Sequence, residues 1–292
     1  MKITIQTPAK INLFLEITGK RPDDYHNLES IMQTVSLYDE ITVEDVSAGI
    51  DLECNNKNLP ADSSNIVYKA AAAVQKRFNI QKGVKITLKK EIPVGAGLGG
   101  GSSDAAAAIK ALVKLWNINA QKTELEQIAA KLGADVPFFL SGGTALCEGI
   151  GDIVRQLRIT NYELRMNGFS LPLVLVNPGF GVSTPSVYKK VRLPFTNPRK
   201  IDKIKNLIES GAFNIEAARQ YCFNRLEDFV FNDHPEIKKI KDVLSSLNCA
   251  SLMSGSGATV FGIYDRPDEH KIKAELEKYN WKFWFVKTVN SI

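Results

Sequence analysis

The stretch Pro93-Val-Gly-Ala-Gly-Leu-Gly-Gly-Gly-Ser-Ser-Asp104 joins a predicted strand to a predicted helix. Before it, residues 84–88 alternate apolar and polar side chains, as a half-buried strand does. After it, residues 105–116 are rich in strong helix formers, with Ser102 or Ser103 as the expected N-cap. Glycines leave the turn without side chains, so its backbone can approach a ligand closely. Because the loop ends at a helix N-terminus, it predicts a phosphate-binding site.

Three better-known phosphate loops differ from this one. The Walker motif needs a lysine directly before the serine, where Gly101 stands here. The dinucleotide-binding fingerprint matches the glycines literally, but it expects an acidic residue at the end of a second strand about twenty residues further on. That region, residues 117–126, reads as the start of another helix. The protein-kinase loop fails because no His-Arg-Asp or Asp-Phe-Gly follows. A glycine loop that serves only packing stays open as an alternative.

Composition indicates an ordinary globular protein. The 292 residues are 44% hydrophobic and 24% charged, which suggests two domains with a real core. The net charge of +5 comes from dispersed lysines and arginines, so a polyanionic small substrate fits it better than a nucleic-acid surface does.

Cysteine use and hydropathy bear on the compartment. Cys54, Cys147, Cys222 and Cys249 form no C-x-x-C pair and no metal spacing with the three histidines, and we interpret them as buried thiols in a reducing compartment. The sequence shows no signal peptide and no run of eighteen apolar residues, so we expect a cytoplasmic protein.

Residues 3–17 contain two strand-like runs. In the second run, isoleucines and leucines alternate with polar side chains, which puts Lys10 and Asn12 on the opposite, exposed face. A lysine on such a face is usually just solvated. A functional role for Lys10 would need a partner from elsewhere in the chain.

Asp135 is a lone carboxylate at the start of the apolar run 136–140. It can cap a short turn ahead of Pro137. It can equally be a partly desolvated carboxylate that needs a cation, and Lys10 is available for that role. Likewise Tyr25 and His26, in the turn-rich loop of residues 19–27, can either stack on a planar ring or simply pack in the loop.

Further elements follow from capping and periodicity. The N-cap candidates at 62–65 predict a helix that ends at Phe78, and Thr123-x-x-Glu126 is a capping box. A polar, irregular stretch around 155–170 is a plausible domain boundary. Beyond it, strands and helices interleave, which indicates an α+β layer with helices on one face of a sheet. The expected elements are strands at 171–176 and 282–289, helices at 200–209, 215–231, 235–247 and 267–279, and two strands within 251–264 around the turn Gly255-Ser-Gly257.

These motifs together resemble one family. Residues 93–103 are similar to the phosphate loop of the GHMP kinases (galactokinase, homoserine, mevalonate and phosphomevalonate kinases), and residues 252–259 resemble their C-terminal glycine motif. Residues 8–13, 21–28 and 133–139 resemble one branch, whose members phosphorylate the 2-hydroxyl of 4-diphosphocytidyl-2-C-methyl-D-erythritol. The five motifs occur in the family's order over nearly the whole chain.

The resemblance implies a two-domain α+β fold. Residues 1–160 would form an ATP-binding domain like domain 2 of ribosomal protein S5, and residues 161–292 a ferredoxin-like domain, with the active site between them. The implied reaction uses ATP, with Mg²⁺, and gives the 2-phosphate and ADP in the non-mevalonate (MEP) isoprenoid pathway. The implied partners are these small molecules, with no nucleic acid, membrane or obligatory protein partner.

The resemblance also implies roles for individual residues. Lys10 and Asp135 match the catalytic pair. Tyr25 and Tyr188 match rings that sandwich the cytosine, and His26 matches the residue that reads the base edge. The remaining matches are Asn12 and Thr184 in the substrate pocket, Asn65 near the adenine, the ATP-binding residues Pro93, Val94, Gly95, Ala96, Gly97, Leu98, Gly99, Gly100, Gly101, Ser102 and Ser103, and the C-terminal glycine motif Gly255, Ser256 and Gly257; the metal ligands are not identified.

Two other functions stay open. A GHMP kinase with another acceptor, such as homoserine, mevalonate or a sugar, is the nearer one, and the Tyr25-His26 pair argues against it. A dinucleotide-dependent oxidoreductase lacks the acidic ribose-binding residue.

Overall fold

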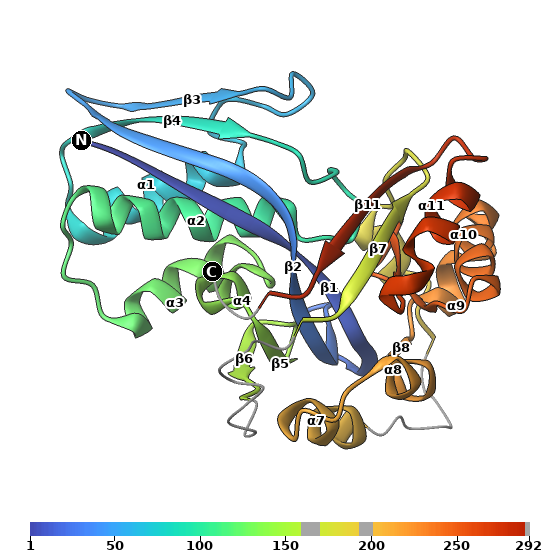
Figure 1. Cartoon of the computed structure of the whole chain (residues 1–292). Helices are drawn as coiled ribbons and strands as arrows, with labels where there is room; N and C mark the ends of the chain where they lie inside the picture. Colours follow the sequence, from blue (N-terminus) through green and yellow to red (C-terminus); the bar gives the residue numbers. More distant parts are fainter. Residues whose placement is uncertain (159–169, 193–200, 290–292) are drawn as a thin grey trace.

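Two β-sheets and the helices that cover them make up the computed structural model, which describes residues 1–158, 170–192 and 201–289 (Figure 1). The first sheet follows the path β3-β4-β2-β1-β8, and β5 and β6 extend it from β2. Its strands are β1 (Lys2–Lys20), β2 (His26–Val46), β3 (Ile50–Cys54), β4 (Gly83–Lys89), β5 (Thr144–Glu148), β6 (Ile153–Gln156) and β8 (Phe223–Asn224).

Strand β1 is one continuous strand of 19 residues, so the prediction of two separate runs is wrong. Shifts of register against β2, one of them between Pro8 and Ala9, let the long strand bend without ending. The predicted exposed face is also wrong, because Lys10 and Asn12 are both buried. The phosphate loop and the C-terminal half of the chain cover that face of β1, and periodicity alone cannot reveal such a cover.

Helices α1 (Ile66–Phe78), α2 (Gly100–Leu115), α3 (Lys122–Leu132) and α4 (Val136–Ser141) lie on one face of this sheet (Figure 1). Asn65, one of the N-cap candidates at 62–65, caps α1: its Oδ1 accepts a hydrogen bond from the amide of Val67. The predicted serine N-cap of α2 is wrong: the helix already begins at Gly100, after Gly99 in a left-handed conformation. The capping box of α3 joins Gln121 and Glu124, not Thr123 and Glu126.

The second sheet has the order β11-β7-β10-β9, with every pair antiparallel. Its strands are β7 (Pro172–Asn177), β9 (Ala250–Met253), β10 (Val260–Ile263) and β11 (Lys282–Lys287). Helices α10 (Pro235–Ser246) and α11 (Glu269–Leu276), the latter after the short η1 (Arg266–Asp268), pack on it. The resulting β-α-β-β-α-β order is that of ferredoxin-like folds, which confirms the expected fold class.

The segment between β7 and β9 joins the two sheets. It holds α6 (Thr184–Tyr188), α7 (Ile201–Glu209), α8 (Ile215–Tyr221) and α9 (Glu227–Val230). A single helix over residues 215–231 is a wrong prediction, since the chain becomes extended at Cys222 and β8 then pairs with Phe14 and Leu15 of β1. The predicted domain boundary at residue 160 lies outside the described residues.

Two further expectations concern the cysteines and the membrane. All four cysteines are free; Cys147 and Cys249 are buried as expected, whereas Cys54 and Cys222 are only half-buried. In the part of the chain that the structure describes, no helix combines the length and the apolar character needed to cross a bilayer.

Candidate active site

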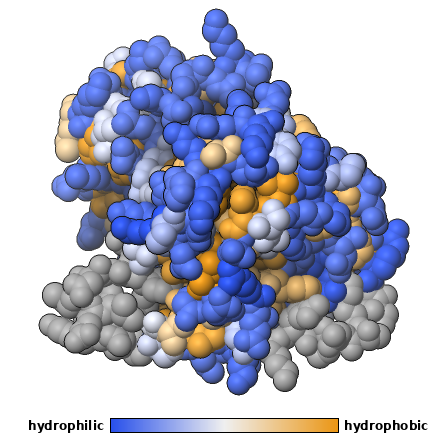
Figure 2. Space-filling view, turned by 45° about the vertical axis from the view of Figure 1, so that its right-hand side comes forward, coloured by the Kyte–Doolittle hydropathy of each residue, from blue (hydrophilic) through white to orange (hydrophobic). Residues whose placement is uncertain are grey.

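A cavity of about 1120 Å³ lies where the phosphate loop meets β1, α6 and the C-terminal glycine motif. On the face in Figure 2, hydrophilic residues dominate the surface and hydrophobic ones gather in a central band. Most of the site residues predicted from the sequence line this cavity. They are Lys10, Asn12, Tyr25, His26, Asn65, Pro93, Val94, Gly95, Ala96, Gly97, Gly99, Gly100, Gly101, Ser102, Asp135, Thr184, Tyr188, Gly255 and Ser256.

Three predicted residues do not line the cavity. The side chain of Leu98 is buried, and the backbone of Gly257 lies against Met253. The Ser103 hydroxyl donates to the carbonyl of Pro8 at 2.7 Å, so it fastens α2 to β1. These residues shape the wall from behind and do not face a ligand.

Four consecutive carbonyl groups of the phosphate loop accept hydrogen bonds from the rest of the protein. Three of the donors come from the C-terminal half of the chain and one from β1. Along the loop, they are the amide of Val182 to Gly95 at 3.1 Å, the amide of Thr259 to Ala96 at 3.2 Å, the hydroxyl of Ser254 to Gly97 at 2.8 Å and the amide of Lys10 to Leu98 at 2.9 Å.

The backbone N–H groups of the same loop remain available. Among the described residues, no protein group accepts a hydrogen bond from the N–H groups of residues 95–102. Because α2 begins at Gly100, the positive end of its dipole lies at the same place. A loop with its carbonyls bound and its N–H groups free is suited to hold an anion, and phosphate is the usual one.

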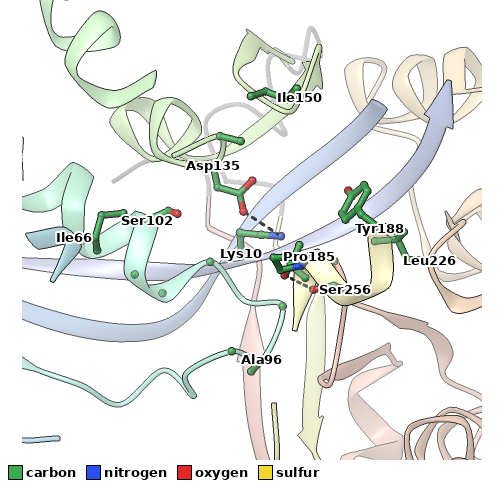
Figure 3. A pocket seen from close by; sticks show the side chains of 18 of the residues that line it. Lys10, Ile66, Ala96, Ser102, Asp135, Ile150, Pro185, Tyr188, Leu226 and Ser256 are labelled. Carbon is green, nitrogen blue, oxygen red and sulfur yellow. Dashed lines mark hydrogen bonds and ion pairs between the residues drawn. The ribbon is translucent and has the colours of Figure 1, made fainter. Parts of the chain in front are cut away.

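Lys10 and Asp135 meet beside this loop. Nζ of Lys10 lies 3.6 Å from Oδ2 of Asp135, and the two side chains point toward each other (Figure 3). Asp135 stands at the N-cap position of α4, but its side chain makes no capping hydrogen bond. Of the two interpretations open from the sequence, the structure therefore supports the carboxylate that faces a cation. The Lys10 side chain is 5% exposed and that of Asp135 is 29% exposed, so the carboxylate is the more accessible partner.

A chain of hydrogen bonds fixes the lysine. Lys10 donates to Oδ1 of Asn12 at 2.7 Å, and Asn12 in turn donates to the hydroxyl of Ser30 at 2.8 Å. That hydroxyl donates to the carbonyl of Phe14 at 2.6 Å. Since all of these groups lie on β1 and β2, the sheet itself determines where the ammonium group sits.

Aromatic side chains form the far end of the cavity. The rings of His26 and Tyr188 lie 5.6 Å apart, with their planes inclined by 39°. Burial lowers the pKa of His26, and the charge of Lys20 lowers it further, so the imidazole is neutral at pH 7. Tyr25 stands at the rim with 60% of its surface exposed. The Thr184 hydroxyl lies 2.7 Å from that of Ser256, which connects this end to the C-terminal glycine motif.

Comparisons with known proteins agree with this geometry. The family model described as "GHMP kinases N terminal domain" matches residues 65–143, and "GHMP kinases C terminal" matches residues 200–281. The chain belongs to the GHMP kinase family.

Comparisons with individual proteins narrow the match within the GHMP kinases. The chain is 42% identical to a Clostridium botulinum protein named 4-diphosphocytidyl-2-C-methyl-D-erythritol kinase, covering 96% of both chains. A Bacillus cereus protein of the same name is 39% identical, covering 98% of this chain and 97% of the relative. A crystal structure of 4-(cytidine 5'-diphospho)-2C-methyl-D-erythritol kinase matches with a TM-score of 0.80 at 32% identity, covering 98% and 99%. Homoserine kinase from Cytophaga hutchinsonii, at 16% identity and a TM-score of 0.74 over 99% and 95%, shares the fold.

The GHMP kinase site also contains residues that the sequence did not single out. Three of them contribute apolar side chains to the wall of the cavity: Pro185, Leu226 and Ile150. Leu226 lies near Tyr188, and Ile150 lies on the side of Asp135 (Figure 3). Lys90 and Asp104 line the cavity beside the phosphate loop. As isolated charges in the sequence they resemble solvated surface residues, and only the folded chain brings them together.

Proposed function

We propose that this GHMP kinase transfers the γ-phosphoryl group of ATP to the 2-hydroxyl of 4-diphosphocytidyl-2-C-methyl-D-erythritol, giving the 2-phosphate and ADP in the MEP pathway. The observation that carries the chemistry is the Lys10–Asp135 pair beside a phosphate loop with free N–H groups. The choice of acceptor rests on the name shared by the relatives that match nearly end to end.

Phosphoryl transfer needs positioning and charge stabilisation more than covalent help. Asp135 would accept the proton of the acceptor hydroxyl, because its carboxylate is the exposed member of the pair. Lys10, fixed by Asn12, would orient that hydroxyl and stabilise the negative charge that develops on the transferred group. The N–H groups of the loop would hold the phosphates that remain with the nucleotide.

The aromatic end would hold the cytosine. A neutral imidazole can both donate and accept a hydrogen bond, as the edge of a cytosine requires, and His26 is neutral at pH 7. Tyr188 lies next to it, and Tyr25 at the rim would cover the other face of the base. Asn12 and Thr184 would contact the substrate between the base and Lys10, since both line the same cavity.

We propose that Asn65, which lines the cavity, forms part of the wall of the adenine pocket. Its Oδ1 caps α1 and its Nδ2 donates to the carbonyl of Pro60 at 2.7 Å. These two hydrogen bonds fix the orientation of the amide group. Asn65 would therefore shape the adenine pocket and contact the base with the remaining capacity of its side chain.

Mg²⁺ is the ion that we propose for this site. Among the described residues, no three His, Cys, Asp or Glu side chains form a ready-made metal cluster. Mg²⁺ bound with nucleotides typically takes one or two protein oxygens and completes its shell with phosphate oxygens and water. The Ser102 hydroxyl and the Asp135 carboxylate both line the cavity and fit this donor set. Held there, the ion would supply positive charge that neutralises the phosphate groups.

We also propose which partners the enzyme has and in which compartment it works. ATP and a cytidine diphosphate substrate are small anions, and we propose that the enzyme acts on them without nucleic acid, membrane or an obligatory protein partner. The four free cysteines fit a reducing compartment, and we propose the cytoplasm.

The test is the release of ADP from ATP and Mg²⁺ with and without 4-diphosphocytidyl-2-C-methyl-D-erythritol. We expect release with this acceptor and none with homoserine, galactose or mevalonate. Release with only one of those other acceptors would refute the substrate while leaving the kinase activity in place. No release with any acceptor would refute the kinase function.

A further inference from the structure

Asn224 of β8 lies outside the cavity, yet its side chain binds two stretches of the cavity wall. The residue is buried, with 2% of its surface exposed. Its Nδ2 donates to the carbonyl of Met253 at 2.7 Å and to that of Gly255 at 2.8 Å. Its Oδ1 accepts a hydrogen bond from the amide of Leu226 at 2.9 Å. Both donors of the side-chain amide are therefore in use, and the proposed chemistry assigns them no role.

The position of Asn224 is fixed on the strand that also carries Lys10. Strand β8 pairs in parallel with β1, where Asn224 stands opposite Leu15. The amide of Arg225 donates to the Leu15 carbonyl at 2.9 Å, and its guanidinium group makes two hydrogen bonds of 2.8 Å to the buried carboxylate of Glu16. Bidentate, charge-assisted pairs of this kind are strong and directional. Asn224 consequently has a defined place relative to β1.

The two carbonyl groups that Asn224 binds lie where β9 ends. Met253 is the last residue of β9, and Gly255 belongs to the turn that follows. A 2.9 Å hydrogen bond from the amide of Gly257 to the carbonyl of Ser254 closes this turn. Because one side-chain amide binds both the end of the strand and the turn, Asn224 determines the direction in which the turn leaves the strand.

Gly255 lies directly against the lysine of the proposed catalytic pair. A Cβ atom added to Gly255 would be 3.3 Å from Nζ of Lys10 and 3.5 Å from Oδ1 of Asn12. Further along the same side chain, a Cβ atom added to Gly99 would be 3.0 Å from Cγ of Lys10. The lysine thus lies against both glycine motifs. If the turn moved away, the ammonium group would gain room to leave Asp135.

The third hydrogen bond of Asn224 concerns the acceptor end of the cavity. Leu226, whose amide donates to Oδ1 of Asn224, lines the cavity and lies near Tyr188 (Figure 3). The oxygen of the side-chain amide therefore serves the wall beside Tyr188, and its nitrogen serves the turn beside Lys10. The two contacts can be separated by substitution, because they use different atoms.

We propose that Asn224 is a positioning residue for phosphoryl transfer: it holds the turn of residues 254–257 against Lys10 and so keeps the ammonium group directed at Asp135. This inference rests on the proposed function, because it takes Lys10 and Asp135 to act on the acceptor hydroxyl. Asn224 acts only through its neighbours, since it does not line the cavity. A displacement of about 1 Å near the reacting groups can lower a rate about 10²-fold.

Asn224→Asp removes the two donors and keeps the acceptor. Its carboxylate can still bind the amide of Leu226, but it presents oxygen atoms to the carbonyls of Met253 and Gly255. We expect kcat to fall about 10–100-fold. The KM for 4-diphosphocytidyl-2-C-methyl-D-erythritol should stay within about twofold of the wild-type value, because the wall at Leu226 is intact. Calorimetric titration with ADP counts the binding sites per chain, and kcat is expressed per site so that unfolded protein is not counted.

Asn224→Ser tests the same contacts without a buried negative charge. Its hydroxyl can accept from the amide of Leu226, as serine does in turns, but one hydroxyl cannot replace two N–H donors. We again expect kcat per site to fall, by about tenfold or more. This variant gives the answer if the carboxylate prevents Asn224→Asp from folding.

Gln33→Glu is the matched control. Gln33 of β2 is also a buried side-chain amide that donates to two backbone carbonyls, those of Thr34 and Val289, each at 2.9 Å. It does not line the cavity. Its substitution should lower the temperature of thermal unfolding, while kcat per ADP-binding site stays at the wild-type value.

Three results would refute this inference and leave the proposed function in place. The first is a wild-type kcat per site in the Asn224 variants that fold. The second is an equal loss of kcat in Gln33→Glu, since any buried amide would then have this effect. The third is a raised KM with an unchanged kcat, which would limit Asn224 to substrate binding. A wild type that releases no ADP with any acceptor would refute the proposed function and this inference with it.

Discussion

The hydroxyl of Ser254 donates a 2.8 Å hydrogen bond to the carbonyl of Gly97 and so joins the two glycine motifs, which lie 157 residues apart in the sequence. The two backbones also approach each other closely, because a Cβ atom on Gly97 would lie 2.1 Å from the carbonyl oxygen of Ser254. Gly97 also has a φ of +76°, which other residues rarely adopt. Both features make Gly97 the position of the phosphate loop that tolerates a side chain least.

Gly97→Ala should therefore abolish nucleotide binding. The added methyl group cannot fit against Ser254, so the loop must move and lose its geometry. The left-handed conformation alone costs a non-glycine residue about 1–2 kcal/mol. ADP titration measures the loss, and thermal unfolding shows whether the rest of the protein stays folded. Gly179→Ala is the matched control, since Gly179 also has a positive φ but no atom within 4 Å of an added Cβ.

Asp135→Ala should lower kcat by about 10²–10⁴, the usual range for the loss of a general base. ADP binding in the absence of Mg²⁺ should change little, because the loop N–H groups are intact. Steady-state kinetics with both substrates test this expectation. Turnover close to that of the wild type would exclude Asp135 from the mechanism.

Tyr25→Ala should raise the KM for the cytidyl substrate about tenfold, with a smaller effect on kcat, because stacking of a base on an aromatic ring contributes about 1–3 kcal/mol. Tyr25 is exposed at the rim, so its removal should leave thermal stability unchanged. Tyr25→Phe keeps the ring and should behave as the wild type does. An unchanged KM in Tyr25→Ala would refute the stacking role.

The free energy of unfolding of Asp104→Asn, relative to that of the wild type, should increase as the pH rises. Burial raises the pKa of Asp104 to about 8 in the folded chain, against an ordinary value of 3.8. Between these two pH values the native state therefore holds a proton that the unfolded state has released. The free energy of unfolding of the wild type then falls through this range, because the unfolded state releases the proton first. Urea denaturation of both proteins between pH 4 and pH 9 should show the difference growing up to about pH 8. A difference that stays constant would contradict a neutral, buried Asp104.

Local signals in the sequence predicted part of the local structure, although they misplaced the N-cap of α2 and the capping box of α3. The phosphate loop, the cap at Asn65 and the order of strands in the C-terminal half follow from glycines, capping residues and periodicity, which act over a few residues. The pairing of Lys10 with Asp135 could only be proposed, because it depends on contacts across 125 positions of sequence.

Other features could not be predicted for the same reason. Alternation along β1 shows that Lys10 and Asn12 share a face, but not that other parts of the chain bury it. The two-residue strand β8 is too short to interrupt a helical pattern visibly. Asp39, Lys90 and Asp104 are charged residues that a sequence pattern places at the surface, whereas in the folded chain Lys90 pairs with both carboxylates and all three side chains are buried.

The origin of the hydrogen bonds to the phosphate loop has a consequence during synthesis. Three of the four donors, at Val182, Ser254 and Thr259, belong to the second half of the chain. A ribosome that has released only the first half has therefore delivered the loop and the Lys10–Asp135 pair without most of the groups that hold the loop in shape. The nascent protein should gain its affinity for nucleotide late and in one step, when β9 and β10 take their places beside the loop.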